Sequence, residues 1–289
     1  MQTITLKEKT KKGQEMQVTF CPEKGMNLVS FKYGNVEIID QSTGVIFEQR
    51  CAGLGALIGP HFHHRKLDTI PHIEDEDLFP HFHLLREQGV KEPFSHGIAR
   101  YVPWKIEKLT NKMVRATLSS KSEWKGISLG KIEGQEFNMV YIAEMSNAGL
   151  CIQYSIVSSH NSLVGLHYYY NKGKNATVEA SVGKQYNDQG IIKTIPSNWL
   201  KNGKLRFDLA NAADYGFLAN PHPLMASIRL TTSDYQLVVR YVSATKENSW
   251  QLYHPKGSSY VCIEPMSAAD PRKPQLSVSG ILVNIEAEV

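Results

Sequence analysis

The chain has 289 residues, of which 42% are apolar and 21% are charged, and its net charge is +4. These proportions are typical of a folded protein with a large core, and the small positive excess gives no reason to expect nucleic-acid binding. The apolar runs are shorter than the roughly 18–20 residues that cross a bilayer, so no membrane partner is expected. The four cysteines form no CxxC pair, and the polar start does not resemble a signal peptide. We therefore expect free thiols and a cytoplasmic protein.

Most of the chain consists of short apolar or alternating runs separated by glycine, proline, asparagine or serine. The pattern predicts strands at 17–20, 27–32, 36–39, 104–108, 113–119, 137–145, 150–157, 163–171, 177–180, 226–231, 236–241, 260–263 and 276–287. The lysine-rich start, residues 7–12, is expected to form a solvated face or edge. No long segment has the 3.6-residue period of a helix, and no change of composition divides the chain. The sequence therefore predicts an all-β sandwich or barrel, with one domain over residues 1–289.

Residues 51–98 interrupt this strand pattern with a long segment that has little periodicity, as is common for functional loops. Glycines are followed by two histidine-rich clusters, His61–His64 and His72–His83, and the second contains the acidic run Glu74–Asp77. Imidazoles and carboxylates are metal ligands, so a metal site is one interpretation. The spacing matches no defined ligand motif, however, and a solvated acidic loop is the simpler interpretation. We expect no metal and no cofactor.

Three further positions carry groups suited to acid–base chemistry. His167 lies among aromatic residues at the end of an apolar strand and shares a strand face with Tyr169. His96 precedes a glycine in a loop that leads to Arg100. Glu264 closes an apolar strand, where a carboxylate is costly unless it is paired or used. Each has a structural alternative: a packed histidine, a capping histidine and a rim carboxylate in water.

These motifs occur together in one order along nearly the whole chain. Gly53-x-Gly55-x-Leu57-Ile58-Gly59-Pro60 with Arg65 comes first, and His96-Gly97-Ile98-Ala99-Arg100 follows. Then come Gly165-Leu166-His167-x-Tyr169 and Cys262-x-Glu264-Pro265. This order resembles the aldose 1-epimerase (galactose mutarotase-like) family. The resemblance implies a large antiparallel β-sandwich, known as a supersandwich, which agrees with the strand pattern.

The resemblance also implies an isomerase that interconverts the α and β anomers of a hexose without a cofactor. His167 matches the family's general acid and Glu264 its general base. His96, Arg65 and Asp214 match substrate-binding residues, with Arg65 near the sugar's ring oxygen. We expect the carboxylate to raise the pKa of His167. Aromatic rings such as Tyr169, Trp104 and Phe94 are candidates to stack on the sugar.

Several departures from the family pattern concern the substrate. His64 stands where the family often has asparagine, Val164 and Tyr168 stand near positions where it often has proline, and the histidine clusters have no counterpart. Arg100 in the run His96–Arg100 makes the sequence resemble the branch of the family that acts on hexose 6-phosphates. Arg65 or Arg86 would then be a second arginine that binds the phosphate.

As an enzyme of this family, the protein would act on free hexoses or on hexose 6-phosphates. A second class of protein is a non-catalytic carbohydrate-binding protein on this fold, since fold alone does not settle activity. A third class is a metal-dependent sugar isomerase or lyase. The expected partner is a sugar or sugar phosphate, and the chain is expected to be a monomer or homodimer.

Overall fold

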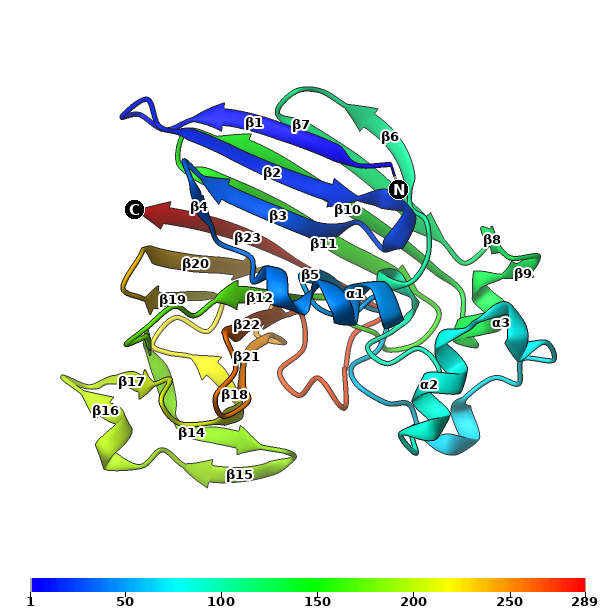
Figure 1. The fold of residues 1–289 in the computed structure, drawn as a ribbon. Coiled ribbons are helices and arrows are strands. Elements are labelled where there is room, and N and C mark those ends of the chain that lie inside the picture. The colour runs from blue at the N-terminus through cyan, green and yellow to red at the C-terminus, as the bar shows by residue number, and fades with distance from the viewer. Residues whose placement is uncertain (1, 289) are drawn as a thin grey trace.

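A computed structural model describes residues 2–288, and strands dominate it (Figure 1). The largest sheet has ten antiparallel strands. In spatial order they are β16 (Leu200–Lys201), β17 (Lys204–Asp208), β13 (Thr177–Ala180), β19 (Met225–Thr231), β20 (Gln236–Ser243), β23 (Val278–Glu288), β11 (Gly149–Ser158), β10 (Phe137–Ser146), β7 (Met113–Ser119) and β6 (Lys105–Leu109).

A second antiparallel sheet has seven strands and carries the residues that matter most below. Its order is β15 (Ile191–Thr194), β14 (Val182–Asp188), β18 (Ala213–Ala219), β21 (Ser249–His254), β22 (Tyr260–Met266), β12 (Gly165–Asn171) and β5 (Gly55–Ile58). The N-terminal sheet has the order β1 (Ile4–Lys9), β2 (Glu15–Cys21), β3 (Asn27–Tyr33) and β4 (Val36–Glu37), and β8 (Glu123–Trp124) pairs with β9 (Ile127–Ser128).

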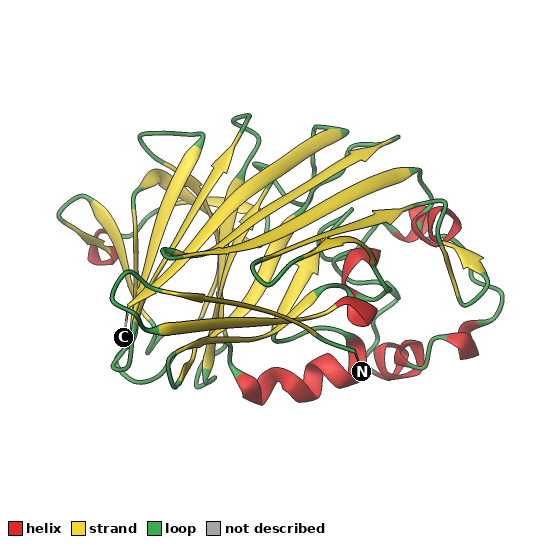
Figure 2. Cartoon of the chain, turned by 90° about the horizontal axis from the view of Figure 1, so that it is seen from above, coloured by secondary structure: helices red, strands yellow, loops and turns green. Residues whose placement is uncertain are grey.

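The helices are short and lie at the margins of the strands (Figure 2). The three α-helices are α1 (Gly44–Arg50), α2 (His81–Glu87) and α3 (Leu129–Glu133). Single 3-10 turns cover 22–24, 41–43, 67–69, 76–78, 98–100 and 197–199. Figure 1 shows α2, α3 and the β8–β9 hairpin gathered at one side of the molecule. Within the non-periodic segment 51–98, β5 joins the seven-stranded sheet, and the rest forms loops, 3-10 turns and α2.

Period-2 alternation places the core between the sheets. In β10, Phe137, Met139 and Tyr141 are buried, whereas Asn138 is exposed. Buried side chains from the three large sheets form one continuous apolar cluster. The N-terminal sheet closes this cluster through contacts of β1 with β10 and of β3 with β5. The mostly β, antiparallel architecture predicted from the sequence is confirmed.

The predicted strands over 113–119 and 177–180 have the observed bounds, and the lysine-rich start contributes to β1, an edge strand. The sequence analysis predicted no strand at β1, β5, β8, β9, β14 to β18 or β21. Several of these are short or lie at a sheet edge, where a weak apolar pattern suffices because one side faces water. Within residues 2–288, all four cysteines are free thiols. The described residues contain no helix long and apolar enough to span a membrane.

Candidate active site

A cavity of about 350 Å³ opens above the middle strands of the seven-stranded sheet. This volume lies in the range of small-molecule sites. Strand residues form its floor and loop residues form its walls. The lining consists of Arg50, Ala52, Phe62, His63, Leu85, Ser95, His96, Arg100, Tyr101, His167, Tyr169, Asp214, Gln251, Tyr253, Glu264 and Arg272.

Strand register builds the floor as two neighbouring rows of side chains. The pairs Gly165↔Met266 and Tyr168↔Ile263 place His167 on β12 opposite Glu264 on β22. Glu264 in turn pairs with Gln251 on β21. Two residues further along the strands, the second row runs through Tyr169, Cys262, Tyr253 and Asp214. Because side chains two residues apart share a face, both rows face the same cavity.

His167 and Glu264 form a close buried pair at the centre of this floor. Their side chains are 8% and 3% exposed, and His167 Nε2 lies 3.4 Å from Glu264 Oε1. Among the residues described, His167 Nδ1 is buried and has no hydrogen-bond partner. The His167 ring stacks on Tyr169 with centroids 4.8 Å apart. An imidazole and a carboxyl group are thus fixed close together and line a cavity that a small molecule can enter.

Burial controls the protonation of this pair. It raises the pKa of Glu264 well above its usual value, and the positive charge of Arg100 only partly opposes the rise. Burial also lowers the pKa of His167, and Arg100 adds to that lowering. The direction for His167 is opposite to the rise expected from the carboxylate, because desolvation is the larger effect. Burial therefore drives both groups toward their uncharged forms.

Among the described residues, the same two side chains and Cys262 form a group that could hold a metal ion. Ligand atoms of His167, Cys262 and Glu264 lie within 4.8 Å of one another. Imidazole, thiolate and carboxylate are all zinc ligands. The histidine-rich clusters, by contrast, are dispersed. His61 contacts Glu133, His81 stacks on Tyr101, and exposed His83 contacts Asp77.

His96 lies on the cavity wall in an unusual backbone conformation. Its φ is +66°, a left-handed value that costs a non-glycine residue of order 1–3 kcal/mol. Backbone bonds hold it there: His96 donates to the His63 carbonyl at 2.9 Å, and Gly59 donates to the His96 carbonyl at 2.9 Å. The His63 amide donates to His96 Nδ1 at 3.3 Å. Neutral His96 therefore carries its proton on Nε2, and burial lowers its pKa and favours that neutral form.

Gly97 allows this loop to approach the preceding one. Its φ is +84°, and a Cβ built at this position would lie 2.1 Å from the Gly59 carbonyl oxygen. A side chain at Gly97 would therefore push apart the two loops that form the cavity wall.

Arg100 lies on the wall of the cavity, in the 3-10 turn 98–100, and is only 2% exposed. Its Nε donates to the Leu57 carbonyl at 2.9 Å, whereas Nη2 is buried without a partner among residues 2–288. The acidic run Glu74–Asp77 does not pair with Arg100; its Glu76 pairs with Arg86. A buried, partly unsatisfied guanidinium next to an empty space is a ready donor for a polar or anionic ligand.

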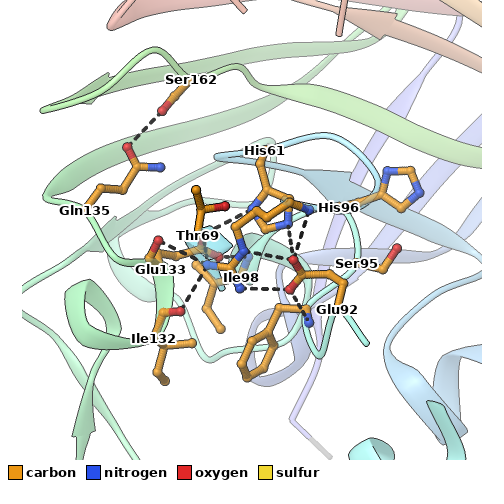
Figure 3. A network of polar contacts seen from close by, with 12 residues as sticks. His61, Thr69, Glu92, Ser95, His96, Ile98, Ile132, Glu133, Gln135 and Ser162 are labelled. Atoms are coloured by element: carbon orange, nitrogen blue, oxygen red, sulfur yellow. Dashed lines mark hydrogen bonds and ion pairs between the residues drawn. The ribbon is translucent and has the colours of Figure 1, made fainter. Parts of the chain in front are cut away.

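Arg65 lies outside the cavity, in contrast to the sugar-contacting position implied by the resemblance. Its Nε and Nη2 form a fork on Glu92 at 2.9 and 2.8 Å. Its Nη1 donates to the carbonyls of Ile132 and Glu133 at 3.2 and 3.1 Å. With its donors bound to protein oxygens, Arg65 is part of a buried charge network. His61, Glu92 and Glu133 of this network lie side by side in Figure 3.

Asp214 faces the cavity from β18 and accepts a hydrogen bond from Gln189 Nε2 at 3.2 Å. Arg86 lines a different cavity, and Phe94 and Trp104 are buried in the core, so of the three suggested rings only Tyr169 lines the site. The sequence analysis missed several lining residues. Gln251 and Tyr253 alternate on an overlooked strand, and that alternation is the signal that identifies them. Arg50 and Arg272 come from a helix end and a loop, and no local pattern marks them. His63 belongs to the His61–His64 cluster, which the sequence analysis considered only as a metal site.

No protein-family model matches the sequence, and no curated protein matches it. Solved structures do match over nearly the whole chain. The Slr1438 protein from Synechocystis sp. PCC 6803 has a TM-score of 0.68 at 16% identity, covering 99% of this chain and 95% of that one. A galactose mutarotase-like protein from Clostridium acetobutylicum has a TM-score of 0.66 at 15% identity, covering 99% and 98%. The GalM/aldose epimerase homologue from C. elegans has a TM-score of 0.66 at 12% identity, covering 99% of both.

These similarities define the fold of the chain, which is the galactose mutarotase-like fold. At identities of 12–16%, the substrate and the catalytic residues have to be argued from the site.

Proposed function

We propose that this protein is an aldose 1-epimerase (mutarotase) that interconverts the α and β anomers of a hexose, with Glu264 as general base and His167 as general acid. The observation that carries the proposal is the 3.4 Å contact between these two buried side chains on the floor of one cavity. The names of the C. acetobutylicum and C. elegans relatives point to the same chemistry.

Anomer exchange requires a proton to leave the C1 hydroxyl and another to reach the ring oxygen. The C1–O5 bond then breaks, the C1–C2 bond rotates, and the ring closes on the other face. Burial favours a protonated Glu264 and a neutral His167. Transfer of one proton from Glu264 to His167 gives the carboxylate and imidazolium that the reaction uses. Recruiting this pair requires no metal or cofactor.

The surrounding groups have roles that fit a sugar. His96 presents an Nε2–H donor to a hydroxyl, and Asp214 offers a carboxylate acceptor. Arg100, in place of Arg65, supplies the guanidinium that stabilises negative charge developing on the ring oxygen. Tyr169 presents an aromatic ring beside His167.

A hexose 6-phosphate is the second candidate substrate, and the charge of the cavity favours it. Arg50, Arg100 and Arg272 line the same space as Asp214 and Glu264. The arginines outnumber the carboxylates, and guanidinium groups bind phosphate through paired charge-assisted hydrogen bonds. In this version the same acid–base pair acts on the sugar ring and the arginines hold the phosphate.

Anomer exchange measured by NMR tests the proposal, using exchange peaks between anomeric protons over a panel of free and 6-phosphorylated hexoses. We expect the protein to accelerate exchange of at least one sugar above its rate in buffer. If sugars bind but none exchanges faster, the site belongs to a carbohydrate-binding protein on this fold.

A further inference from the structure

A buried charge network lies directly behind the wall that carries His96 and Arg100. Glu92 and Glu133 are 2% and 4% exposed, and Arg65 and His61 lie between their carboxylates. His61 Nδ1 is 3.2 Å from Glu133 Oε2, and His61 Nε2 is 3.8 Å from Glu92 Oε2. Two buried carboxylates are costly unless cations and hydrogen bonds compensate both.

The network joins three segments that are distant in sequence (Figure 3). His61 and Arg65 come from the loop after β5, Glu92 from the loop after α2, and Glu133 from the last residue of α3. Arg65 also donates to two carbonyls at the C-terminal end of α3, where a cation is favourable. The network is therefore a rigid junction that fixes these segments against one another.

Both carboxylates hold the segment that bears the cavity residues. Glu92 Oε1 accepts from the Phe94 amide at 3.0 Å, two residues before His96. Glu133 Oε1 accepts from the Ile98 amide at 2.6 Å, two residues after His96 and two before Arg100. Both carboxylates also accept hydrogen bonds from Arg65. Glu92 accepts them through both of its oxygens, and Glu133 accepts one through Oε2.

His96 needs such support because its left-handed backbone is intrinsically unfavourable. A shift of this segment would also move the His63 carbonyl–His96 amide bond and the His63 amide–His96 Nδ1 contact that sets the ring's tautomer. An error of about 1 Å in the position of a catalytic or binding group can cost on the order of 100-fold in rate.

We propose that Glu133, held by Arg65 and His61, is a positioning residue that fixes His96 and Arg100 on the cavity wall. Its effect on the reaction rests on the mutarotase function proposed above, and it acts through those two residues without touching the sugar. The arrangement also assigns Arg65 a role at this junction, away from the substrate.

Glu133→Gln is the main test because it keeps the shape of the side chain and removes its charge. A carboxylate has two acceptor oxygens, but an amide has only one. The glutamine oxygen can accept either from the Ile98 amide or from Arg65 and His61, so one side of the junction weakens. We expect Ile98 amide hydrogen exchange to accelerate roughly tenfold, and the imidazole nitrogen spectrum of His96 to show loss of the pure Nε2–H tautomer. We also expect kcat/KM for anomer exchange to fall roughly tenfold, with a larger fall for Glu133→Ala.

Glu179→Gln is the matched control, because Glu179 pairs with Arg206 at 2.6 Å on the exposed surface of the ten-stranded sheet. In this control, Ile98 amide exchange and kcat/KM should stay within about twofold of wild type, and the His96 nitrogen spectrum should be unchanged. The Ile98 and His96 measurements need no activity, so they decide the positioning role even if the wild type fails to exchange anomers. A folded Glu133→Gln protein with wild-type Ile98 protection and an unchanged His96 spectrum would overturn the proposal.

Discussion

Desolvation at His167 and Glu264 has a direct consequence for catalysis. Each group is driven toward its uncharged form, so the pair has no strong preference for a fixed ion pair that would have to be broken. Arg100 nearby favours the carboxylate form of Glu264 and disfavours the imidazolium form of His167. One buried cation therefore adjusts the balance between the two proton positions on which the proposed reaction depends.

The first prediction at this scale concerns metal. Dialysis against EDTA should leave anomer exchange unchanged, because proton transfer between His167, Glu264 and the sugar requires no Lewis acid. The rate is measured before and after chelation on protein purified without a histidine tag. A loss of exchange that zinc or manganese restores would contradict this and would point to the His167, Cys262 and Glu264 group.

A second prediction separates the two substrate classes. Arg272 lies on the cavity wall, with its guanidinium 5.8 Å from the centre of the Phe62 ring. If the substrate is phosphorylated, Arg272→Ala should raise KM for a hexose 6-phosphate about tenfold or more and barely change kcat, because a remote binding contact is lost. Steady-state exchange kinetics on both sugars provide the check. An equal change for the free hexose and its phosphate would favour the free hexose as substrate.

At the scale of elements, the site depends on the contrast between strands and loops. The strands β12, β22, β21 and β18 fix the floor through backbone register. The wall segments have no strand-to-strand hydrogen bonds to fix their positions. Buried ion pairs and hydrogen bonds between loops hold them instead. Breaking a buried pair by removing one partner leaves an uncompensated charge, so these junctions also contribute to stability.

The third prediction tests that contribution through pH. The Arg65 hydrogen bonds and nearby positive charges outweigh desolvation and lower the pKa of Glu92 from 4.5 to about 2. Because the folded-state pKa is the lower one, its stabilisation is present above about pH 4.5 and is lost as the pH falls toward 2. A depression of this size is worth roughly 3–4 kcal/mol.

Thermal unfolding between pH 7 and pH 2 measures this effect. Glu92→Gln should melt lower than wild type at pH 7, and the gap should shrink as the pH falls from 5 to 2. Glu179→Gln again serves as the control, with a pH dependence parallel to wild type. A constant gap between Glu92→Gln and wild type would show that the charge of Glu92 is not responsible for the difference.

At the scale of the whole molecule, period-2 alternation was sufficient to predict the fold class, since strands such as β7 and β10 carry a clear core face. The motif order led to His167, Glu264, His96, Arg100 and Asp214, all of which line one cavity. The motif order also led to Arg65, but Arg65 does not line this cavity. Only the tertiary structure shows that Glu92 and Glu133 bind its guanidinium. Arg50 and Arg272 reach the cavity through long-range packing, which no local pattern encodes.

Anomer exchange in a Glu264→Gln variant tests the central claim most directly. The amide keeps the shape of the side chain but cannot accept a proton, and a general base contributes typically about 10²–10⁴-fold to a rate. For the best substrate of the panel, we expect NMR exchange spectroscopy to show a loss of this size, while titration calorimetry shows nearly unchanged sugar binding. Near-wild-type exchange by a folded Glu264→Gln protein at neutral pH would contradict the account.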